Sequence, residues 1–326
     1  MKLRKLGKTG LQVSEIGFGA WAIGDSEWGK QDDGESLKAL HRAAELGANF
    51  IDTAEVYGNG KSEKLIAKFR KEWKGDLIVA TKTPIDGGAW PPSPYDASEV
   101  AFSESFLRKN VEERLRNLGT DCLDILQLHT WTRAWNRNPK PLEILRKLRQ
   151  EGKIRFIGVS TPEHDQNSVV DLIRAGWVDT VQVIYNIFEQ EPAAEILPAA
   201  HEHGVGIIVR VAFDEGALTG KFTRDTVFPK TDFRSEYFRG DRLGRTVDRA
   251  ERIKQDLLGS GYTMAQAALK FSLDHPGVST VISGIRNLAQ AEANLGASDL
   301  PDLPPSLMEK LREHNWRRGI WHGEHW

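Results

Sequence analysis

The chain has 326 residues, of which 40% are hydrophobic and 28% charged, and its formal net charge at pH 7 is −2. This composition is typical of a globular protein, and the charge gives no reason to expect nucleic acid or an anionic membrane surface as a partner. Cys122 is the single cysteine, which excludes an intrachain disulfide and fits a reducing compartment. No apolar run reaches the about 18 residues of a membrane span, and the charged N-terminus lacks a signal-peptide core, so we expect a cytoplasmic protein.

Short apolar runs alternate with amphipathic segments along the chain. Residues 2–14 predict a hairpin, because apolar and polar residues alternate on both sides of a Lys-Thr-Gly turn. The strands predicted after it are 15–21, 49–52, 76–82, 123–129, 153–160, 179–185, 206–211 and 278–284. The predicted helices are 33–47, 61–72 with Ser62 as its N-cap, 98–117, 140–150, 165–175, 192–203, 263–273, 287–296 and 305–315. Residues 212–246 show no regular pattern and predict a long irregular segment.

The order of these segments predicts the fold class. The strands are apolar without clean alternation, which indicates burial on both faces and parallel pairing. Eight strand–helix units predict an α/β protein with a closed (β/α)8 TIM barrel, to which the N-terminal hairpin and extra helices and loops are added. No change in composition marks a second domain, so we expect residues 1–326 to form a single barrel, with residues 317–326 as a flexible or pocket-capping tail. The Gly17-Phe18-Gly19 turn lacks the third glycine of a Rossmann fingerprint.

Four ionisable side chains lie at or just beyond the ends of predicted strands. Asp52, Lys82 and His129 each end a strand, and Tyr57 follows Asp52 in a glycine-rich loop. In a (β/α)8 barrel the active site lies at the C-terminal ends of the strands. We therefore expect these four side chains to meet at the mouth of the barrel.

Carbonyl reduction is the chemistry that this combination favours. The ammonium of Lys82 is expected to lower the pKa of the Tyr57 phenol from its reference value of about 10, which makes the phenol a usable general acid. Asp52 is expected to hold Lys82 in its charged form. His129 can donate a hydrogen bond to the carbonyl oxygen, while the hydride must come from a nicotinamide cofactor.

Several longer motifs surround these residues. They are L-G-K-T-G-L-Q-V-S-E-I-G-F-G-A-W from Leu6, N-F-I-D-T-A-E-V-Y-G-N-G-K-S-E from Asn49, A-T-K, L-D-I-L-Q-L-H, I-G-V-S at 157–160, E-G-A-L-T-G-K-F at 215–222 and S-G-I-R-N-L-A-Q-A-E-A-N at 283–294. With these motifs the chain resembles the aldo-keto reductases over essentially its whole length. The resemblance implies a barrel that binds NADPH in extended form without a Rossmann domain. It also implies that Asp52, Tyr57, Lys82 and His129 form a catalytic tetrad.

The same resemblance implies a set of cofactor-binding residues. Ser160 and Gln182 match the positions that hold the nicotinamide carboxamide, and Thr161 stands where the family usually has Asn. Arg210 falls where many members stack an aromatic ring on the nicotinamide, and a guanidinium can stack there too. Residues that match the pyrophosphate loop, whose backbone amides and lysine suit an anion, are Gly216, Leu218, Gly220 and Lys221. Residues that match adenosine-side contacts are Gly284, Arg286, Gln290 and Asn294. Arg286 is placed for the 2′-phosphate of the adenosine, which points to NADP+ over NAD+.

The loops and the tail are expected to set the substrate. Trp21, Trp90 and Thr130 are predicted to line the pocket, and no metal is expected. Many of the 10 tryptophans lie in loops or the tail, namely Trp28, Trp90, Trp131, Trp135, Trp316, Trp321 and Trp326. They suggest either an aromatic-walled pocket or interface, or scattered surface and packing residues. The arginines of residues 224–245 suggest either a solvated loop face or a lid and pocket wall. His322 and His325 suggest either a metal or substrate wall or a frayed terminus.

Three functions remain open from the sequence. The leading hypothesis is NADPH-dependent reduction of a small polar or sugar-like aldehyde or ketone, and the protein could act as a monomer or as a homo-oligomer. A Schiff-base aldolase that uses Lys82 is the second, although Asp52 would raise the lysine pKa that an imine-forming residue needs lowered. The third is a non-catalytic, NADPH-binding regulatory subunit of a channel or other assembly.

Overall fold

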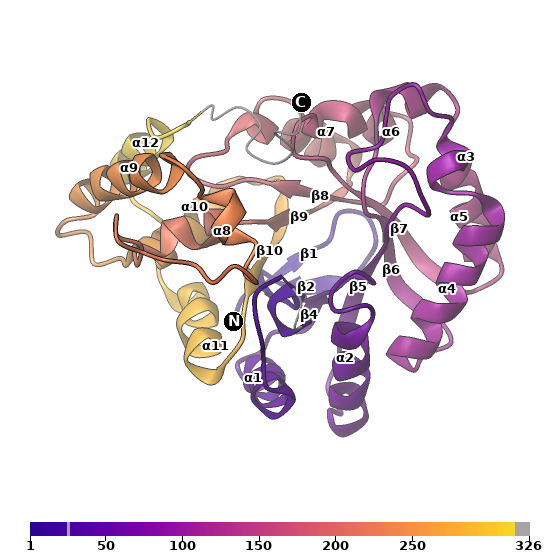
Figure 1. The fold of residues 1–326 in the computed structure, drawn as a ribbon, viewed down its shortest axis with the longest axis horizontal. Helices are drawn as coiled ribbons and strands as arrows, with labels where there is room; N and C mark the ends of the chain where they lie inside the picture. Colours follow the sequence, from indigo (N-terminus) through magenta and orange to yellow (C-terminus); the bar gives the residue numbers. More distant parts are fainter. Residues whose placement is uncertain (25–26, 317–326) are drawn as a thin grey trace.

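The computed structural model describes residues 1–24 and 27–316. Parallel strands form a closed barrel in the order β10-β3-β4-β5-β6-β7-β8-β9, and helices surround it (Figure 1). The predicted (β/α)8 barrel is thereby confirmed. Its strands are β3 (Ile16–Gly19), β4 (Phe50–Asp52), β5 (Ile78–Thr83), β6 (Leu123–Leu128), β7 (Ile154–Ser160), β8 (Thr180–Ile184), β9 (Gly206–Arg210) and β10 (Val278–Gly284).

Helices connect successive barrel strands, and several begin at capping side chains. Asp32 accepts from Glu35 N at the start of α1, and Thr263 and Gln266 form a capping box on α10. None of the helices in the described part of the chain has the length and apolar character needed to cross a membrane. The α-helices are α1 (Asp33–Glu45), α2 (Lys61–Glu72), α3 (Ser98–Ala101), α4 (Glu104–Leu118), α5 (Lys140–Gln150), α6 (Val170–Arg174), α7 (Ile196–His203), α8 (Arg234–Tyr237), α9 (Arg242–Asp256), α10 (Met264–Asp274), α11 (Leu288–Leu295) and α12 (Pro305–Arg312). Short 3₁₀ turns are η1 (Trp21–Ile23), η2 (Arg133–Arg137), η3 (Gln166–Val169), η4 (Glu191–Ala193), η5 (Asp214–Thr219) and η6 (Gly296–Asp299).

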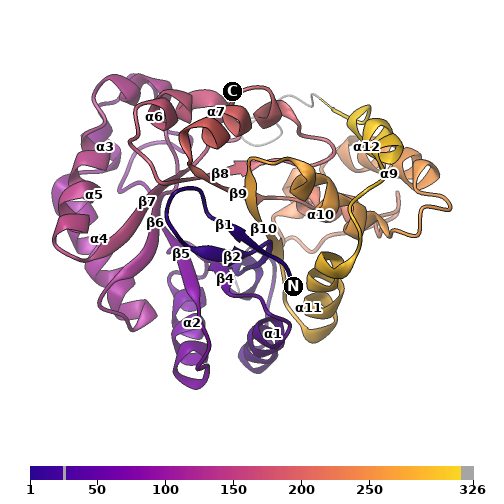
Figure 2. The same cartoon turned by 180° about the vertical axis from the view of Figure 1, so that it is seen from behind.

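The N-terminal hairpin closes one end of the barrel. It consists of β1 (Leu3–Lys5) and β2 (Gln12–Ser14), paired antiparallel, and in Figure 2 it lies in front of the barrel strands. Leu6, at its turn, is fully buried and belongs to an apolar cluster with side chains from β4, β5, β6, β9 and β10. Burying a leucine side chain in this way contributes about 2 kcal/mol. The hairpin therefore covers the barrel end opposite to the strand C-termini.

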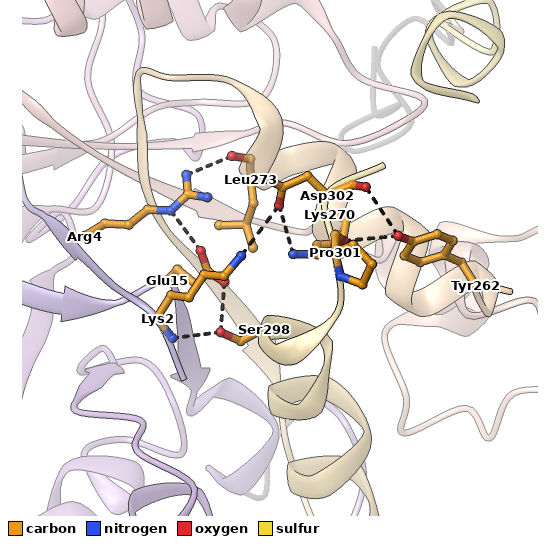
Figure 3. A network of polar contacts seen from close by, with 9 residues as sticks. All are labelled: Lys2, Arg4, Glu15, Tyr262, Lys270, Leu273, Ser298, Pro301 and Asp302. Carbon is orange, nitrogen blue, oxygen red and sulfur yellow. Dashed lines mark hydrogen bonds and ion pairs between the residues drawn. The ribbon is translucent and has the colours of Figure 1, made fainter. Parts of the chain in front are cut away.

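A buried carboxylate fastens this hairpin to the outer helices. Glu15 is 1% exposed, and its Oε2 lies 3.0 Å from Arg4 Nε. Figure 3 shows this contact within the network around Glu15. Its Oε1 accepts a hydrogen bond from Ser298 Oγ at 2.8 Å, while Arg4 Nη1 donates to Leu273 O at 2.8 Å. The contacts join the first fifteen residues to α10 and η6. The network therefore holds the N-terminal segment to the elements on either side of β10 and α11.

Replacing Glu15 by glutamine is expected to lower the free energy of unfolding by about 2 to 3 kcal/mol, because the partly buried Arg4 guanidinium loses its charge partner. Urea denaturation measures the change. Lys2→Met is the matched control, since the Lys2–Asp302 pair is exposed at 3.8 Å and such pairs contribute less than about 1 kcal/mol. Equal and small losses in both variants would contradict the anchoring role of Glu15.

Two local predictions in the first half of the chain are wrong. The helix predicted over residues 98–117 is divided into α3 and α4, because Phe102 leaves helical geometry to place its ring in the core. Ser103 then caps α4, its Oγ accepting from Phe106 N at 3.2 Å. Ser62 does not cap α2, because Gly60, with φ +79°, is the N-cap residue. The Ser62 hydroxyl donates instead to Ala20 O at 3.0 Å.

The segment predicted as irregular over residues 212–246 is irregular over more than half of its length, but it also contains short helical elements. It contains η5 and α8, and its last residues begin α9, a helix that the sequence pattern did not predict. The apolar face of α9 is narrow, since Val247, Ala250 and Ile253 stand among many charged residues. In both views α9 lies beside α12 on the outside of the barrel (Figures 1 and 2). The predicted tail, residues 317–326, lies outside the described residues, and so do His322 and His325.

Candidate active site

A buried ion pair lies at the C-terminal ends of β4 and β5. Lys82 is fully buried, and its Nζ lies 2.5 Å from Asp52 Oδ1 and 3.2 Å from Tyr57 Oη. It also donates to Thr53 O at 2.9 Å. Asp52 is in register with Ala80, which lies two residues before Lys82. Side chains two residues apart on a strand point to the same face, so Asp52 and Lys82 both face the barrel interior from adjacent strands. Three members of the predicted tetrad are thus in direct contact.

The second oxygen of Asp52 is held by two glutamines. Gln182 Nε2 donates to Oδ2 at 2.7 Å, and Gln127 Nε2 lies 3.3 Å from the same atom. A buried carboxylate is stable when its lone pairs are satisfied in this way. Gln127 was not predicted from the sequence, although its position two residues before His129 indicates an inward-facing side chain.

His129 follows β6 and lies beside this ion pair. Its backbone N–H donates to Thr83 O at 2.9 Å, and its ring centroid lies 6.2 Å from that of Tyr57. Burial holds the pKa of His129 well below its ordinary value, and the charges of Lys82 and Arg210 lower that pKa further. The imidazole is therefore neutral at neutral pH, with one N–H donor available.

The pKa of the Tyr57 phenol is shifted upward, whereas a downward shift was expected. Burial raises the pKa of Tyr57 above 10.0, and the opposing effect of the Lys82 ammonium does not cancel it. The lowering that the sequence predicted is present but is the smaller contribution. For Lys82, burial acts to lower the pKa, but Asp52 and Tyr57 raise it on balance. At neutral pH the site therefore holds a protonated phenol next to a charged ammonium.

Aromatic rings flank both reactive groups. Trp21 stacks on Tyr57 with ring centroids 5.8 Å apart, and Phe233 in turn stacks on Trp21 with ring centroids 5.0 Å apart. Trp28 meets both Trp21 and Phe233 edge-on. Trp90, which is 58% exposed, lies edge-on to His129 at 5.7 Å. Trp21 and Trp90 thus lie where the pocket was predicted, whereas Phe233 was not predicted because no pattern in its loop distinguishes it.

Other predicted pocket residues are packed in the interior. Thr130 is fully buried, and its Oγ1 has no hydrogen-bond partner within residues 1–24 and 27–316. Trp131 and Trp135 are buried with their rings 5.3 Å apart, and Trp316 packs on Phe188. The prediction of an aromatic wall thus fits only the tryptophans near Tyr57 and His129. Trp321 and Trp326 lie outside the described residues.

The residues predicted to hold the nicotinamide lie on β7, β8 and β9. Ser160 and Gln182 are in register on adjacent strands, and both are buried. Gln182 Oε1 is buried and has no hydrogen-bond partner in the described part of the chain. Arg210 Nη2 donates to Thr161 O at 3.1 Å, and its Nη1 lies 3.6 Å from Glu163. An unsatisfied amide oxygen fits an N–H donor such as a carboxamide.

The residues predicted to bind the pyrophosphate lie in η5 and directly after it. Gly216 and Gly220 have φ of +100° and +72°, which only glycine adopts without strain. The N–H groups of Gly216 and Leu218 donate to Phe213 O, and that of Gly220 donates to Ala217 O. These three amides are therefore used inside the segment, contrary to the expectation that they face an anion. Lys221 is exposed.

Arg286 holds the loop between β3 and α1. Its Nη1 donates to Trp28 O at 3.0 Å, its Nη2 to Lys30 O at 2.9 Å and its Nε to Gln31 Oε1 at 3.0 Å. Its backbone N–H donates to Gln290 Oε1, and Asn294 Nδ2 donates to Gly284 O. The adenosine-side residues thus lie together, but the sequence did not predict that the Arg286 guanidinium contacts this loop.

Most arginines of residues 224–245 form ion pairs with carboxylates of the same segment or of α9. Arg234 forms an ion pair with Asp232 and lies over the rings of Trp28 and Phe228, at 4.6 and 4.9 Å from their centroids. Arg224 pairs with Asp248. These contacts favour a structural role over a free cationic lid. No group of three or more His, Cys, Asp or Glu side chains in the described ranges could hold a metal ion.

Comparison with known proteins identifies the family of the chain. The model of the Aldo/keto reductase family matches residues 15–315. The chain is 32% identical to the aldo-keto reductase YhdN of Bacillus subtilis (strain 168), over 90% of this chain and 87% of that protein. It is 27% identical to the NADH-specific methylglyoxal reductase of Escherichia coli (strain K12), over 96% and 99%. The glycerol dehydrogenase AKR11B4 from Gluconobacter oxydans has a similar structure, with a TM-score of 0.78 and 27% identity over 96% of this chain and 94% of that one. The chain therefore belongs to the aldo/keto reductase family.

Proposed function

We propose that this oxidoreductase reduces an aldehyde or ketone to the alcohol, with NADPH as cofactor. The observation that carries the proposal is the Tyr57 hydroxyl, which lies 3.2 Å from Lys82 Nζ and next to the ring of a neutral histidine. A phenol needs such an ammonium to give up a proton at a useful rate. The comparisons support the family, and the cofactor and the substrate class are our inference.

Each side chain of the tetrad has a separate role in this proposal. The Tyr57 hydroxyl donates a proton to the substrate oxygen, and the Lys82 ammonium stabilises the phenolate that remains. Asp52 keeps Lys82 charged and in place. The N–H of His129 orients the carbonyl oxygen and stabilises the negative charge that develops on it. Nicotinamide, when bound, supplies the hydride, and Gln182 and Ser160 would hold its carboxamide.

The walls of the site favour a small substrate with both apolar and polar faces. Trp21 and Trp90 present aromatic rings beside Tyr57 and His129, and such rings pack on the C–H face of a sugar or a short carbon chain. The names of two relatives, a methylglyoxal reductase and a glycerol dehydrogenase, refer to small polar molecules. We infer a small polar or sugar-like carbonyl as the substrate class.

Tryptophan fluorescence tests the proposal directly. Trp21 and Trp28 lie at the site, so cofactor binding is expected to quench the emission. NADPH is expected to bind at micromolar concentration or tighter, and the complex is expected to reduce members of a panel of small aldehydes and ketones. Binding without reduction of any carbonyl would support a regulatory subunit instead. Absence of binding by either NADPH or NADH would overturn the cofactor assignment.

Replacing Arg286 by methionine is expected to weaken NADPH binding by about 30-fold and NADH binding by only about threefold. Only NADPH loses a charge-assisted contact to its 2′-phosphate, whereas both lose the anchoring of the loop at Trp28. Fluorescence titration with each cofactor gives the two ratios. Gln31→Ala is the matched control, because it loosens the same loop and keeps the cation, so both affinities should fall equally. Equal losses in Arg286→Met would assign Arg286 to the loop alone.

A further inference from the structure

We propose that Arg114, a residue of α4 that lies against the outer face of the barrel wall, is a positioning residue that fixes Tyr57 relative to Lys82. The inference rests on the proposed function, in which Lys82 stabilises the phenolate that remains after Tyr57 has donated its proton to the substrate. Tyr57 belongs to the loop after β4, and Lys82 belongs to β5. The backbone joins the two segments through the Glu55 N–H, which donates a long hydrogen bond of 3.4 Å to Lys82 O. Side chains of α4 contact both segments from behind.

Arg114 is a fully buried cation between two carboxylates. Its exposed fraction is 0%, its Nη1 lies 2.6 Å from Glu55 Oε2, and its Nε lies 2.9 Å from Glu63 Oε2. The separations are those of ion pairs, although the N–H groups are not aligned as hydrogen bonds. Its Nη2 lies 3.4 Å from Glu113, which is half exposed. A buried guanidinium is retained only where such partners compensate its desolvation.

The first partner leads to Tyr57. Glu55 lies two residues before Tyr57, and its Oε2 also accepts from Asn110 Nδ2 at 2.5 Å. Its carbonyl accepts from Gly60 N at 2.7 Å, which closes the loop around Tyr57. Within this loop Asn59 has φ +52°, a conformation that costs free energy unless the surroundings hold it. The contacts of Glu55 with α4 thus hold in place the loop that carries the Tyr57 phenol.

The second partner leads to Lys82. Glu63, on α2, is fully buried, and its Oε1 accepts from Thr81 Oγ1 at 2.7 Å. On the other side of Lys82, Thr83 Oγ1 donates to Asn110 Oδ1 at 2.9 Å. Side chains alternate along a strand, so Thr81 and Thr83 point outward while Lys82 points into the barrel. Both neighbours of Lys82 are therefore held by the side chains that surround Arg114.

Arg114 is the cation that these contacts share. Burial raises the pKa of Glu63, and Arg114 opposes that rise. Without the guanidinium, Glu55 and Glu63 would lie close together as uncompensated carboxylates, and the loop that carries Glu55 would move outward into water. A shift of about 1 Å between reacting groups can lower a rate by about 100-fold. The distance between Tyr57 Oη and Lys82 Nζ is therefore the quantity that Arg114 controls.

Steady-state kinetics of three variants test this role. Glu55→Gln and Arg114→Lys are expected to lower kcat for carbonyl reduction by about 10- to 100-fold, and Arg114→Met by more, because lysine can still pair with one carboxylate. KM for the carbonyl and the affinity for NADPH should change by less than about twofold, since Arg114 contacts neither. Arg116→Met is the matched control, because Arg116 is an exposed residue of the same helix and its replacement should leave kcat unchanged.

A second measurement does not depend on turnover. The ionisation of Tyr57 is obtained from the tyrosinate absorbance of each protein after subtraction of the same protein carrying Tyr57→Phe. In the Glu55→Gln and Arg114→Lys variants Tyr57 is expected to ionise at higher pH than in the parent, because the Lys82 ammonium is farther away. A loss of thermal stability with unchanged kcat and unchanged Tyr57 ionisation would overturn the inference. If the parent reduces no carbonyl, the proposed function fails, and the Tyr57 ionisation still decides whether Arg114 positions the phenol.

Discussion

Replacing Tyr57 by phenylalanine is expected to lower kcat for carbonyl reduction by about 1,000-fold, because the site loses its proton donor. The change removes one oxygen atom and keeps the ring that stacks on Trp21. Lys82 keeps its contacts with Asp52 and Thr53 O, so the fold and the cofactor affinity should be preserved. Steady-state kinetics on the best carbonyl substrate, with cofactor binding measured on the same preparation, give the result.

Tyr95→Phe is the matched control for this prediction. Its side chain is 95% exposed, so loss of its hydroxyl should leave kcat unchanged. A Tyr57→Phe variant that retains more than about a tenth of the parent kcat would contradict general acid catalysis by Tyr57. Loss of NADPH binding in the same variant would instead assign Tyr57 to the cofactor.

Replacing Lys82 by methionine is expected to lower kcat for reduction by about 100- to 1,000-fold. Lys82 lowers the pKa of Tyr57, although burial keeps that pKa above 10.0 on balance. Without the ammonium the pKa rises further, so the phenol becomes a weaker acid. Because the reaction needs the protonated phenol, the decline of kcat at high pH should move to still higher pH. A pH profile of kcat measures both the lower plateau and this shift.

The double variant Lys82→Met with Asp52→Asn controls for the buried charge. Lys82→Met alone leaves Asp52 without a cation, although Gln182 and Gln127 still contact its Oδ2. The double variant restores charge balance and should recover stability without recovering kcat. Recovery of kcat would show that the ammonium is needed only to neutralise Asp52.

Lys82 also distinguishes the reductase from a Schiff-base aldolase. Imine formation needs a neutral amine, whereas the contacts with Asp52 raise the pKa of Lys82 above its ordinary value. Borohydride reduction in the presence of a carbonyl compound should therefore leave Lys82 unmodified, as peptide mass analysis would show. A covalent adduct on Lys82 that is absent from the Lys82→Met protein would favour the aldolase.

The sequence by itself determined the barrel and the positions of the tetrad. Strands β4, β5 and β6 are short and mostly apolar, and Asp52, Lys82 and His129 come at or next to their ends. In a parallel barrel those ends meet at one face, so a local pattern is enough to predict convergence. Trp21 and Trp90 were predicted by the same argument, since each lies in a loop that follows a strand.

Only the tertiary structure decided which side chains from segments distant in sequence contact one another. The contacts of Arg286 with the loop at Trp28, of Phe233 with Trp21 and of Arg114 with Glu55 each join residues from different elements. No periodicity records such pairs, because side-chain packing and charge compensation set them after the strands and helices have formed. For the same reason the direction of the Tyr57 pKa could not be predicted. The sequence identifies Lys82 as a neighbour, but desolvation depends on everything packed around the phenol.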